Sequence, residues 1–167
     1  EIMRVLEGTL TVTLDEKSFT AKAGDIIFVH SGILHSGIPE KCVYECIVFD
    51  MNAFLKAGSV CSGYIQRIVH QDIMIYHHFT AKQKEIIASA NSIFQAFLKK
   101  EDGYELTVFG QFYHFFGLIF GNHYYFESLP KARRDYKRIL QLKQVVEFIE
   151  KNYSSPITLQ QLSDSVS

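Results

Sequence analysis

The hydrophobic pattern of this chain changes its period near residue 80, and that change limits the possible fold more than any other feature. Before it, polar and apolar residues alternate, which is typical of strands with one buried face. After it, apolar residues recur three and four positions apart, which is typical of amphipathic helices. Strands followed by helices predict an α+β fold, and 47% hydrophobic residues are enough to fill its core.

Short strands are predicted over about residues 1–79. Four apolar or alternating runs are bounded by turn residues: Thr9–Leu14, Ser18–Ala23, Ile26–Val29 and Val43–Phe49. The first two are joined by a polar turn, so they predict a hairpin that ends at Gly24 and Asp25. Short strands at this spacing favour a β-sandwich or a small barrel. After Asp50 the pattern weakens, and Tyr64–Val69 is expected to be extended.

Two antiparallel helices are predicted over about residues 80–127. Thr80 is the expected N-cap of the first, which ends at Asp102 and Gly103. The second, Tyr104–Phe126, is apolar on nearly every side, so it must be covered on several sides. One face can pack on the first helix, and another on the sheet or on a partner subunit. We therefore expect a homodimer that forms through the helices of residues 81–126.

The last part of the chain begins with a basic connector and continues as two helices. Apolar residues from Ile139 to Tyr153 mark one helix face, and Pro156 cannot continue that helix. Thr158 and Gln161 have the spacing of a capping box, which predicts a second helix beginning there. We divide the chain into residues 1–127, a linker at 128–137 and a third region at 138–167.

The charge and cysteine content exclude several classes of protein. The net charge of −1 is not that of an autonomous nucleic-acid binder, although residues 131–151 hold seven basic residues against three acidic ones. Three cysteines without CxxC spacing do not make a disulfide scaffold, so we expect reduced, buried thiols. No apolar run is long enough to span a membrane. With no secretory signal, the chain is expected to be a piece of a longer cytoplasmic protein.

The segment from Gly24 to His35 resembles the second motif of the cupins, in which Gly, Pro, Gly and His stand at set spacings. His30 occupies the proline position. Glu1 and Gly8 match the end of the first cupin motif, whose His-x-His would precede residue 1. The resemblance implies a double-sheet jelly roll, a barrel that can hold one ligand in its interior.

A metal site in this barrel would need three or four converging nitrogen or oxygen ligands, and the chain offers only His35 and Glu1. We therefore expect neither a metal nor a cofactor. His35 remains open to three roles: a hydrogen-bonded core histidine, a contact to an organic ligand, or a metal ligand.

Candidate ligand-binding residues follow from strand parity. The cupin resemblance implies that Glu1 points inward, and Met3 then shares its face. On residues 43–49, Tyr44 and Glu45 lie on opposite faces, and parity does not decide which face is inside. A lone carboxylate such as Glu45 on an apolar face is costly to bury without a partner. The candidate site comprises Glu1, Met3, His35, Tyr44 and Glu45.

Residues 138–163 resemble the opening of the DNA-binding domain of the AraC/XylS family of transcription regulators. The resemblance rests on a helix with Ile149 and Tyr153 near its end, Pro156 in the turn, and the run Thr-Leu-Gln-Gln-Leu-Ser from Thr158. Ser163 replaces the usual Ala. In that family a cupin domain and two helices precede the DNA-binding domain, in the order found here.

The AraC/XylS resemblance implies a region that senses a small-molecule effector and dimerises, rather than an enzyme. The effector would be a sugar or another small molecule, and it would control DNA binding by recognition helices beyond Ser167. The fragment itself is expected not to bind specific DNA. The alternative is a metal-dependent cupin enzyme, an isomerase or dioxygenase, using upstream histidines with Glu1 and His35. The residues before Glu1 would discriminate between these two functions.

Overall fold

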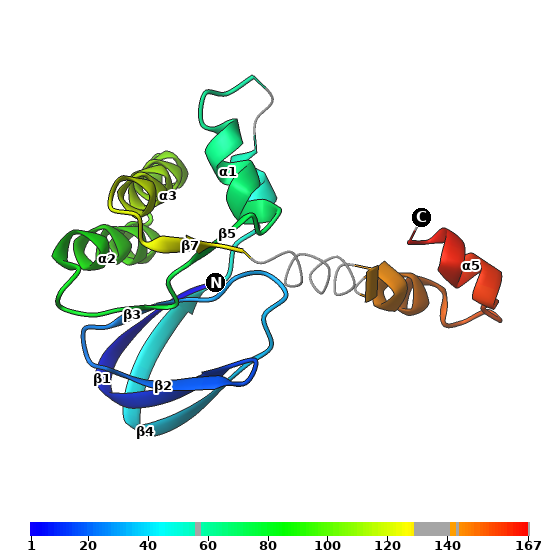
Figure 1. Cartoon of the computed structure of the whole chain (residues 1–167), viewed down its shortest axis with the longest axis horizontal. Coiled ribbons are helices and arrows are strands. Elements are labelled where there is room, and N and C mark those ends of the chain that lie inside the picture. The colour runs from blue at the N-terminus through cyan, green and yellow to red at the C-terminus, as the bar shows by residue number, and fades with distance from the viewer. Residues whose placement is uncertain (56–57, 129–140, 143, 167) are drawn as a thin grey trace. The chain divides into compact units, whose positions relative to one another are not determined.

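A computed structural model describes residues 1–55, 58–128, 141–142 and 144–166. The chain divides into two compact units, Glu1–Glu127 and Ser128–Ser167 (Figure 1). The first unit contains all of the described strands. The second contains the described helical residues of the C-terminal part. The predicted linker at 128–137 lies, apart from Ser128, outside the described residues.

The first unit is built on a strongly curled antiparallel sheet (Figure 1). Its strands are β1 (Ile2–Leu14), β2 (Lys17–Lys22), β3 (Ile26–Phe28), β4 (His35–Ile47) and β6 (His78–Phe79). One edge of β1 pairs with β4 over its whole length, and the other pairs with β3 at one end and β2 at the other. β6 pairs with β3. The long β1 therefore carries the curvature of the sheet.

A β-bulge in β1 helps to produce this curl. The register between β1 and β4 shifts on both sides of Glu7, and Gly8 has a φ of +68°. A Cβ at Gly8 would collide with the carbonyl oxygens of Glu40 and Lys41. Bulges bend the strand that carries them and increase its twist. Glycine at position 8 therefore lets the two long strands fold into a half-barrel.

The predicted mixed fold of strands and helices is confirmed, and the details of the sheet correct the sequence analysis. The described strands form one half-barrel and a separate two-stranded sheet, β5–β7, rather than the two facing sheets of a jelly roll. β4 begins at His35 instead of Val43 and runs through Pro39. Proline is tolerated there because, among the described strands, β4 pairs only with β1 and has a free edge.

Helices and a second, small sheet cover one face of the half-barrel. These elements are η1 (Met51–Phe54), α1 (Ser62–Val69), β5 (Ile73–Ile75), α2 (Lys84–Lys99), α3 (Tyr104–Gly121) and β7 (Tyr125–Glu127). α2 and α3 lie side by side (Figure 1), as the short connection between them predicts. β5 pairs antiparallel with β7.

Three sequence predictions in this region are wrong. The segment Tyr64–Val69 belongs to the helix α1, because Ile65 and Ile68 are spaced to bury one helix face. The first long helix begins at Lys84 after Gln83, since Thr80 instead starts a turn in which its carbonyl accepts from Gln83.

The second long helix also differs from its predicted range. It stops at Gly121 rather than Phe126. The left-handed φ of +55° at His123 reverses the chain, and residues 125–127 then pair with β5.

Two apolar clusters lie on opposite faces of the curled sheet. The larger joins Ile2, Ile26 and Phe28 to buried residues of α1, α2 and α3, among them Ile93, Phe112 and Phe115. The smaller lies on the concave face and contains Met3, Val5, Leu10, Val12, Leu14, Ala21, Ile27 and Val29. Adjacent strand residues thus serve different clusters, as the period of two requires.

The second unit, described by itself, is helical at residues 141–142 and 144–152 and again in α5 (Leu159–Asp164). Thr158 Oγ1 accepts from the Gln161 N–H at 3.2 Å, and the Gln161 side chain accepts from the Thr158 N–H at 2.9 Å. The predicted capping box is therefore confirmed. Within the described part of the chain, no helix is long and apolar enough to cross a membrane.

Candidate functional site

The pairing of β1 with β4 decides which face of β4 belongs to the concave side of the half-barrel. Met3 lies opposite Cys46, and Val5 lies opposite Tyr44. Side chains directly opposite each other in an antiparallel pair share a face. Since Met3 and Val5 belong to the concave cluster, Tyr44 and Cys46 border that same face.

Glu1 extends the sheet beyond β1 and meets His35 at the start of β4. Its terminal amino group donates to the carbonyl of Val29 at 2.9 Å, and the Val29 N–H donates to the carbonyl of Glu1 at 2.9 Å. The Glu1 carboxylate Oε2 then lies 3.4 Å from His35 Nε2. His35 pairs with Leu14 at the far end of β1, so this contact closes the curled strand pair on itself.

The connection from Val29 to His35 makes that closure possible. It leaves β3 next to Glu1 and reaches Leu34, whose carbonyl accepts from the Asp15 N–H at 2.8 Å. Leu34 also donates its N–H to the Asp15 carboxylate at 3.2 Å. The glycine and histidine spacing of the cupin-like segment thus places His35 beside Glu1, although the two are far apart in sequence.

Cys46 is a third polar group at this position, and the sequence analysis did not include it. Its side chain is exposed rather than buried. Partial desolvation, the negative charge of Glu1 and a hydrogen bond to that carboxylate together raise the pKa of the Cys46 thiol. The thiol therefore stays protonated near neutral pH and serves as a hydrogen-bond donor rather than a nucleophile. Cys46 stands two residues after Tyr44, so the alternation of faces along this strand was the signal that could have identified it.

Of the five predicted site residues, the structure brings four to the concave side of the half-barrel. Glu1 and His35 are in contact, Met3 contributes to the buried floor, and Tyr44 is about half exposed. Glu45 is not brought together with them. Its carboxylate accepts from Arg4 Nε at 2.7 Å on the opposite face of the sheet. The partner that a carboxylate needs on an apolar face is therefore Arg4.

His30, which stands where the cupin motif has proline, is buried beneath the connection to His35. Its Nε2 accepts a hydrogen bond from the Ile75 N–H at 2.8 Å. Burial lowers the pKa of His30 to about 3, and the neighbouring His77 acts in the same direction. The imidazole is therefore neutral, with its proton on Nδ1 because Nε2 is the acceptor.

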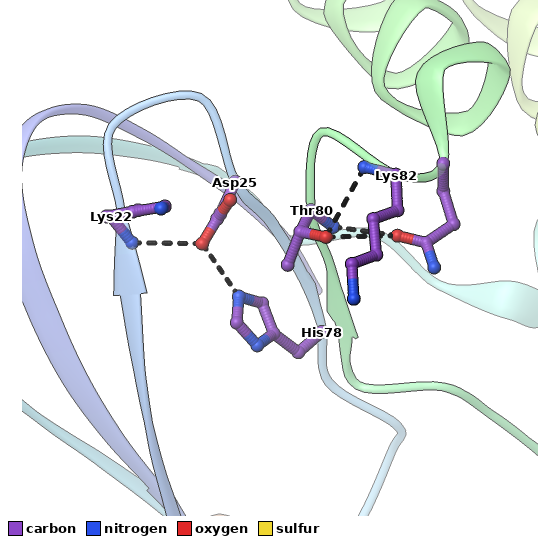
Figure 2. A network of polar contacts seen from close by, with 6 residues as sticks. Lys22, Asp25, His78, Thr80 and Lys82 are labelled. Carbon is purple, nitrogen blue, oxygen red and sulfur yellow. Dashed lines mark hydrogen bonds and ion pairs between the residues drawn. The ribbon is translucent and has the colours of Figure 1, made fainter.

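The adjacent histidines 77 and 78 have separate hydrogen-bond partners. His77 Nδ1 lies 2.9 Å from the carbonyl of Phe28. Figure 2 shows His78 Nε2 on the carboxylate of Asp25 at 2.8 Å, while the same carboxylate accepts from the Lys22 N–H at 3.1 Å. Asp25 is buried, so these bonds satisfy its charge and hold β6 to the turn before β3.

The candidate site therefore combines an apolar floor with a rim of polar groups. The carboxylate of Glu1 accepts hydrogen bonds, the Cys46 thiol donates, and His35 and the Tyr44 hydroxyl can do either. Among the residues that the structure describes, no group of three or more His, Cys, Asp or Glu is arranged to hold a metal ion. This arrangement suits reversible binding of a small polar molecule with an apolar part.

Comparison with known proteins agrees with this geometry. The family model of the AraC-like ligand binding domain matches residues 1–106, which cover the half-barrel, α1, α2 and the start of α3. No curated protein and no solved structure was found to match the chain.

Proposed function

The chain belongs to the family of AraC-like ligand binding domains, and from this premise we propose that it is the effector-sensing region of an AraC-family transcription regulator. A small molecule binds on the concave side of the half-barrel and changes the balance between two conformations of the domain. The bound effector thereby controls DNA binding by a domain C-terminal to residues 1–167. No covalent bond of the effector is made or broken.

The contact between Glu1 and His35 carries this proposal. It is 3.4 Å long, and the two side chains are respectively 16% and 37% exposed, so a ligand at the rim can reach both. A hydroxyl-rich molecule such as a sugar can hydrogen-bond to the carboxylate and the imidazole, while Met3 supplies an apolar contact beneath it. The Tyr44 hydroxyl adds a further polar group from β4.

We also propose that the protein is a homodimer formed through the helices of residues 81–126. Leu98 on α2 and Leu106 on α3 are exposed. On α3, Gly110, Gly117 and Gly121 have open space where a Cβ would stand, so a second helix can approach this face closely. A two-fold dimer would suit paired DNA half-sites.

We also propose that the protein is located in the cytoplasm. The three cysteines Cys42, Cys46 and Cys61 are free thiols in the structure, which suits a reducing compartment.

Thermal denaturation with a panel of sugars, small carboxylates and small aromatic compounds tests the effector site. We expect at least one compound to raise the Tm of the wild-type chain, because it binds only the folded state. The shift should be lost in His35→Ala and reduced in Tyr44→Phe. Glu45→Gln is the matched control, since Glu45 lies on the opposite face and should leave the shift intact.

Two results would contradict the proposal. A compound whose stabilising effect is the same in His35→Ala, Tyr44→Phe and Glu45→Gln would bind elsewhere on the molecule. A panel in which no compound shifts the Tm of the wild-type chain would count against effector binding at this site.

A further inference from the structure

The connection that carries His35 is held from the helical side of the domain by two buried polar side chains. His30 Nε2 accepts from the backbone N–H of Ile75 in β5 at 2.8 Å. Gln71, which lies between α1 and β5, donates from Nε2 to the carbonyl of Ser31 at 2.8 Å. Both bonds join this connection to the same short segment of the chain.

These two residues are exceptional in their burial. Among the described residues only Arg4, Asp25, His30, Gln71 and Ser89 are polar and buried, and His30 and Gln71 are each 5% exposed. A buried polar side chain is costly unless it is hydrogen-bonded, so the hydrogen-bond partner of each residue holds its side chain in one position. Gln71 also has a left-handed φ of +53°, a conformation that a non-glycine residue adopts at some cost.

The segment that receives these bonds leads to the end of the first unit. Ile75 of β5 lies opposite Tyr125 of β7, and Ile73 lies opposite Glu127. The Tyr76 N–H extends this pairing by donating to the carbonyl of Tyr124 at 3.0 Å. β7 is the last element of the unit that ends at Glu127, and the chain continues from it into the second unit.

We propose that His30 and Gln71 form a mechanical relay from the effector site to β7. The relay rests on the proposed function, because its input is a change at His35. Displacing His35 from Glu1 moves the connection between Val29 and His35, and the bonds at His30 and Ser31 transmit that movement to β5. The pairing of β5 with β7 carries it to the point where the chain leaves the sensor unit.

Directional bonds are needed for this transmission. The surrounding cluster, which includes Phe28, Ile75 and Phe115, is apolar, and the hydrophobic effect that holds it together is non-directional. A hydrogen bond weakens steeply when its angle or length changes. The connection and β5 must therefore move together or lose a bond between buried groups.

Hydrogen exchange of the full 167-residue chain, followed by NMR without any effector, tests the relay. His35→Ala supplies the perturbation, because it removes the contact to Glu1 while leaving β5 and β7 unaltered. We expect it to change the exchange rates of the Tyr125, Phe126 and Glu127 amides by about threefold or more, the scale of ordinary coupling between sites. The same substitution is then made in three further variants of the chain.

In the Gln71→Met and His30→Gln backgrounds, His35→Ala should change those rates by less than about twofold. Ser89→Ala is the matched control background. Ser89 is equally buried and polar, but its hydroxyl pairs with His114 at 3.2 Å between α2 and α3, so the response of β7 should persist. If His30→Gln does not fold, Gln71→Met decides the question by itself.

The relay is overturned if His35→Ala leaves β7 exchange unchanged in the wild-type background. It is equally overturned if the full response survives in Gln71→Met. The hydrogen-exchange experiment contains no effector, so a negative result there would reject the relay without bearing on effector binding. Effector binding is tested separately by the thermal-shift experiment, whose failure would not change the exchange rates.

Discussion

Arg4 and Glu45 lie directly opposite each other on β1 and β4, and Arg4 donates from Nε to the Glu45 carboxylate at 2.7 Å. The same guanidinium donates from Nη1 to Asn91 of α2 at 3.2 Å and stacks over the ring of Phe94 at 4.6 Å. This pair therefore ties both long strands to α2. It lies one residue away from Met3 and Tyr44, which face the effector side.

Removing the Arg4 side chain should destabilise the domain. In Arg4→Met the Glu45 carboxylate and the Asn91 amide lose their partner, so the free energy of unfolding should fall by about 1–3 kcal/mol. We expect a loss no larger than this because the Glu45 side chain is about one-third exposed, so water screens its ion pair with Arg4. Urea denaturation measures the change. Glu45→Gln keeps a hydrogen-bond acceptor and should cost less than Arg4→Met; an equal or larger cost would contradict the assignment.

Stability should fall with acid because His30 is neutral in the fold. Its pKa is about 3 in the folded state against 6.5 as the ordinary value, so the unfolded chain binds the extra proton first. The contribution of neutral His30 to the free energy of unfolding is complete above pH 6.5. It is lost as the pH falls from there toward 3, by about 1.4 kcal/mol per pH unit at most. Denaturation of His30→Gln across this range should show a flatter profile than the wild type. Parallel profiles would contradict a neutral, buried His30.

Gly8 and Gly24 form a matched pair for testing the bulge. Both have positive φ, but a Cβ at Gly8 would collide with the backbone of Lys41, whereas a Cβ at Gly24 would meet nothing within 4 Å. Gly24→Ala should lower the free energy of unfolding by about 1–2 kcal/mol, because alanine disfavours the positive φ at this position. Gly8→Ala should cost more, since the strand pair must also shift. Chemical denaturation of both variants measures the difference, and equal costs would show that the close approach at Gly8 is not needed.

The dimer predicts a specific effect of charge on α3. Leu106→Glu introduces a carboxylate on an exposed position of the proposed interface and should weaken the dimer tenfold or more, about 1.4 kcal/mol. Leu34→Glu is the control, because Leu34 is equally exposed but lies beside the half-barrel. Analytical ultracentrifugation measures both. A monomeric wild-type chain at tens of micromolar, or a dimer that Leu106→Glu leaves unchanged, would refute the interface.

Cys46 should react slowly with thiol reagents in spite of its exposure. Its pKa is raised by desolvation and by Glu1, so the thiolate fraction is small at pH 8. Glu1→Gln removes the negative charge and should accelerate modification of Cys46 several-fold. Mass spectrometry of peptides after a short exposure to a thiol reagent follows each cysteine separately. Cys61, which stands at the N-terminus of α1 rather than beside Glu1, is the internal control and should be unaffected.

The local patterns of the sequence determined much of the fold. Alternation in Thr9–Leu14 predicted the central strand and its hairpin, and the spacing of apolar residues predicted the helices α2 and α3. The capping box at Thr158 and Gln161 was also readable, because it depends on side chains only three positions apart. The cupin-like spacing from Gly24 to His35 indicated a cupin-type domain before any tertiary contact was known, whereas the resemblance to the AraC family rested on residues 138–163, outside the matched residues 1–106.

The tertiary structure alone decided the composition of the site. Parity placed Tyr44 and Glu45 on opposite faces, but only the register of β4 on β1 could show which face is concave, because register joins residues about forty positions apart. The curl at Gly8 then brought His35 to Glu1, and the partner of Glu45 proved to be Arg4. The sequence determined which groups were available, whereas long-range strand pairing decided which of them meet, because a contact between distant residues leaves no local pattern.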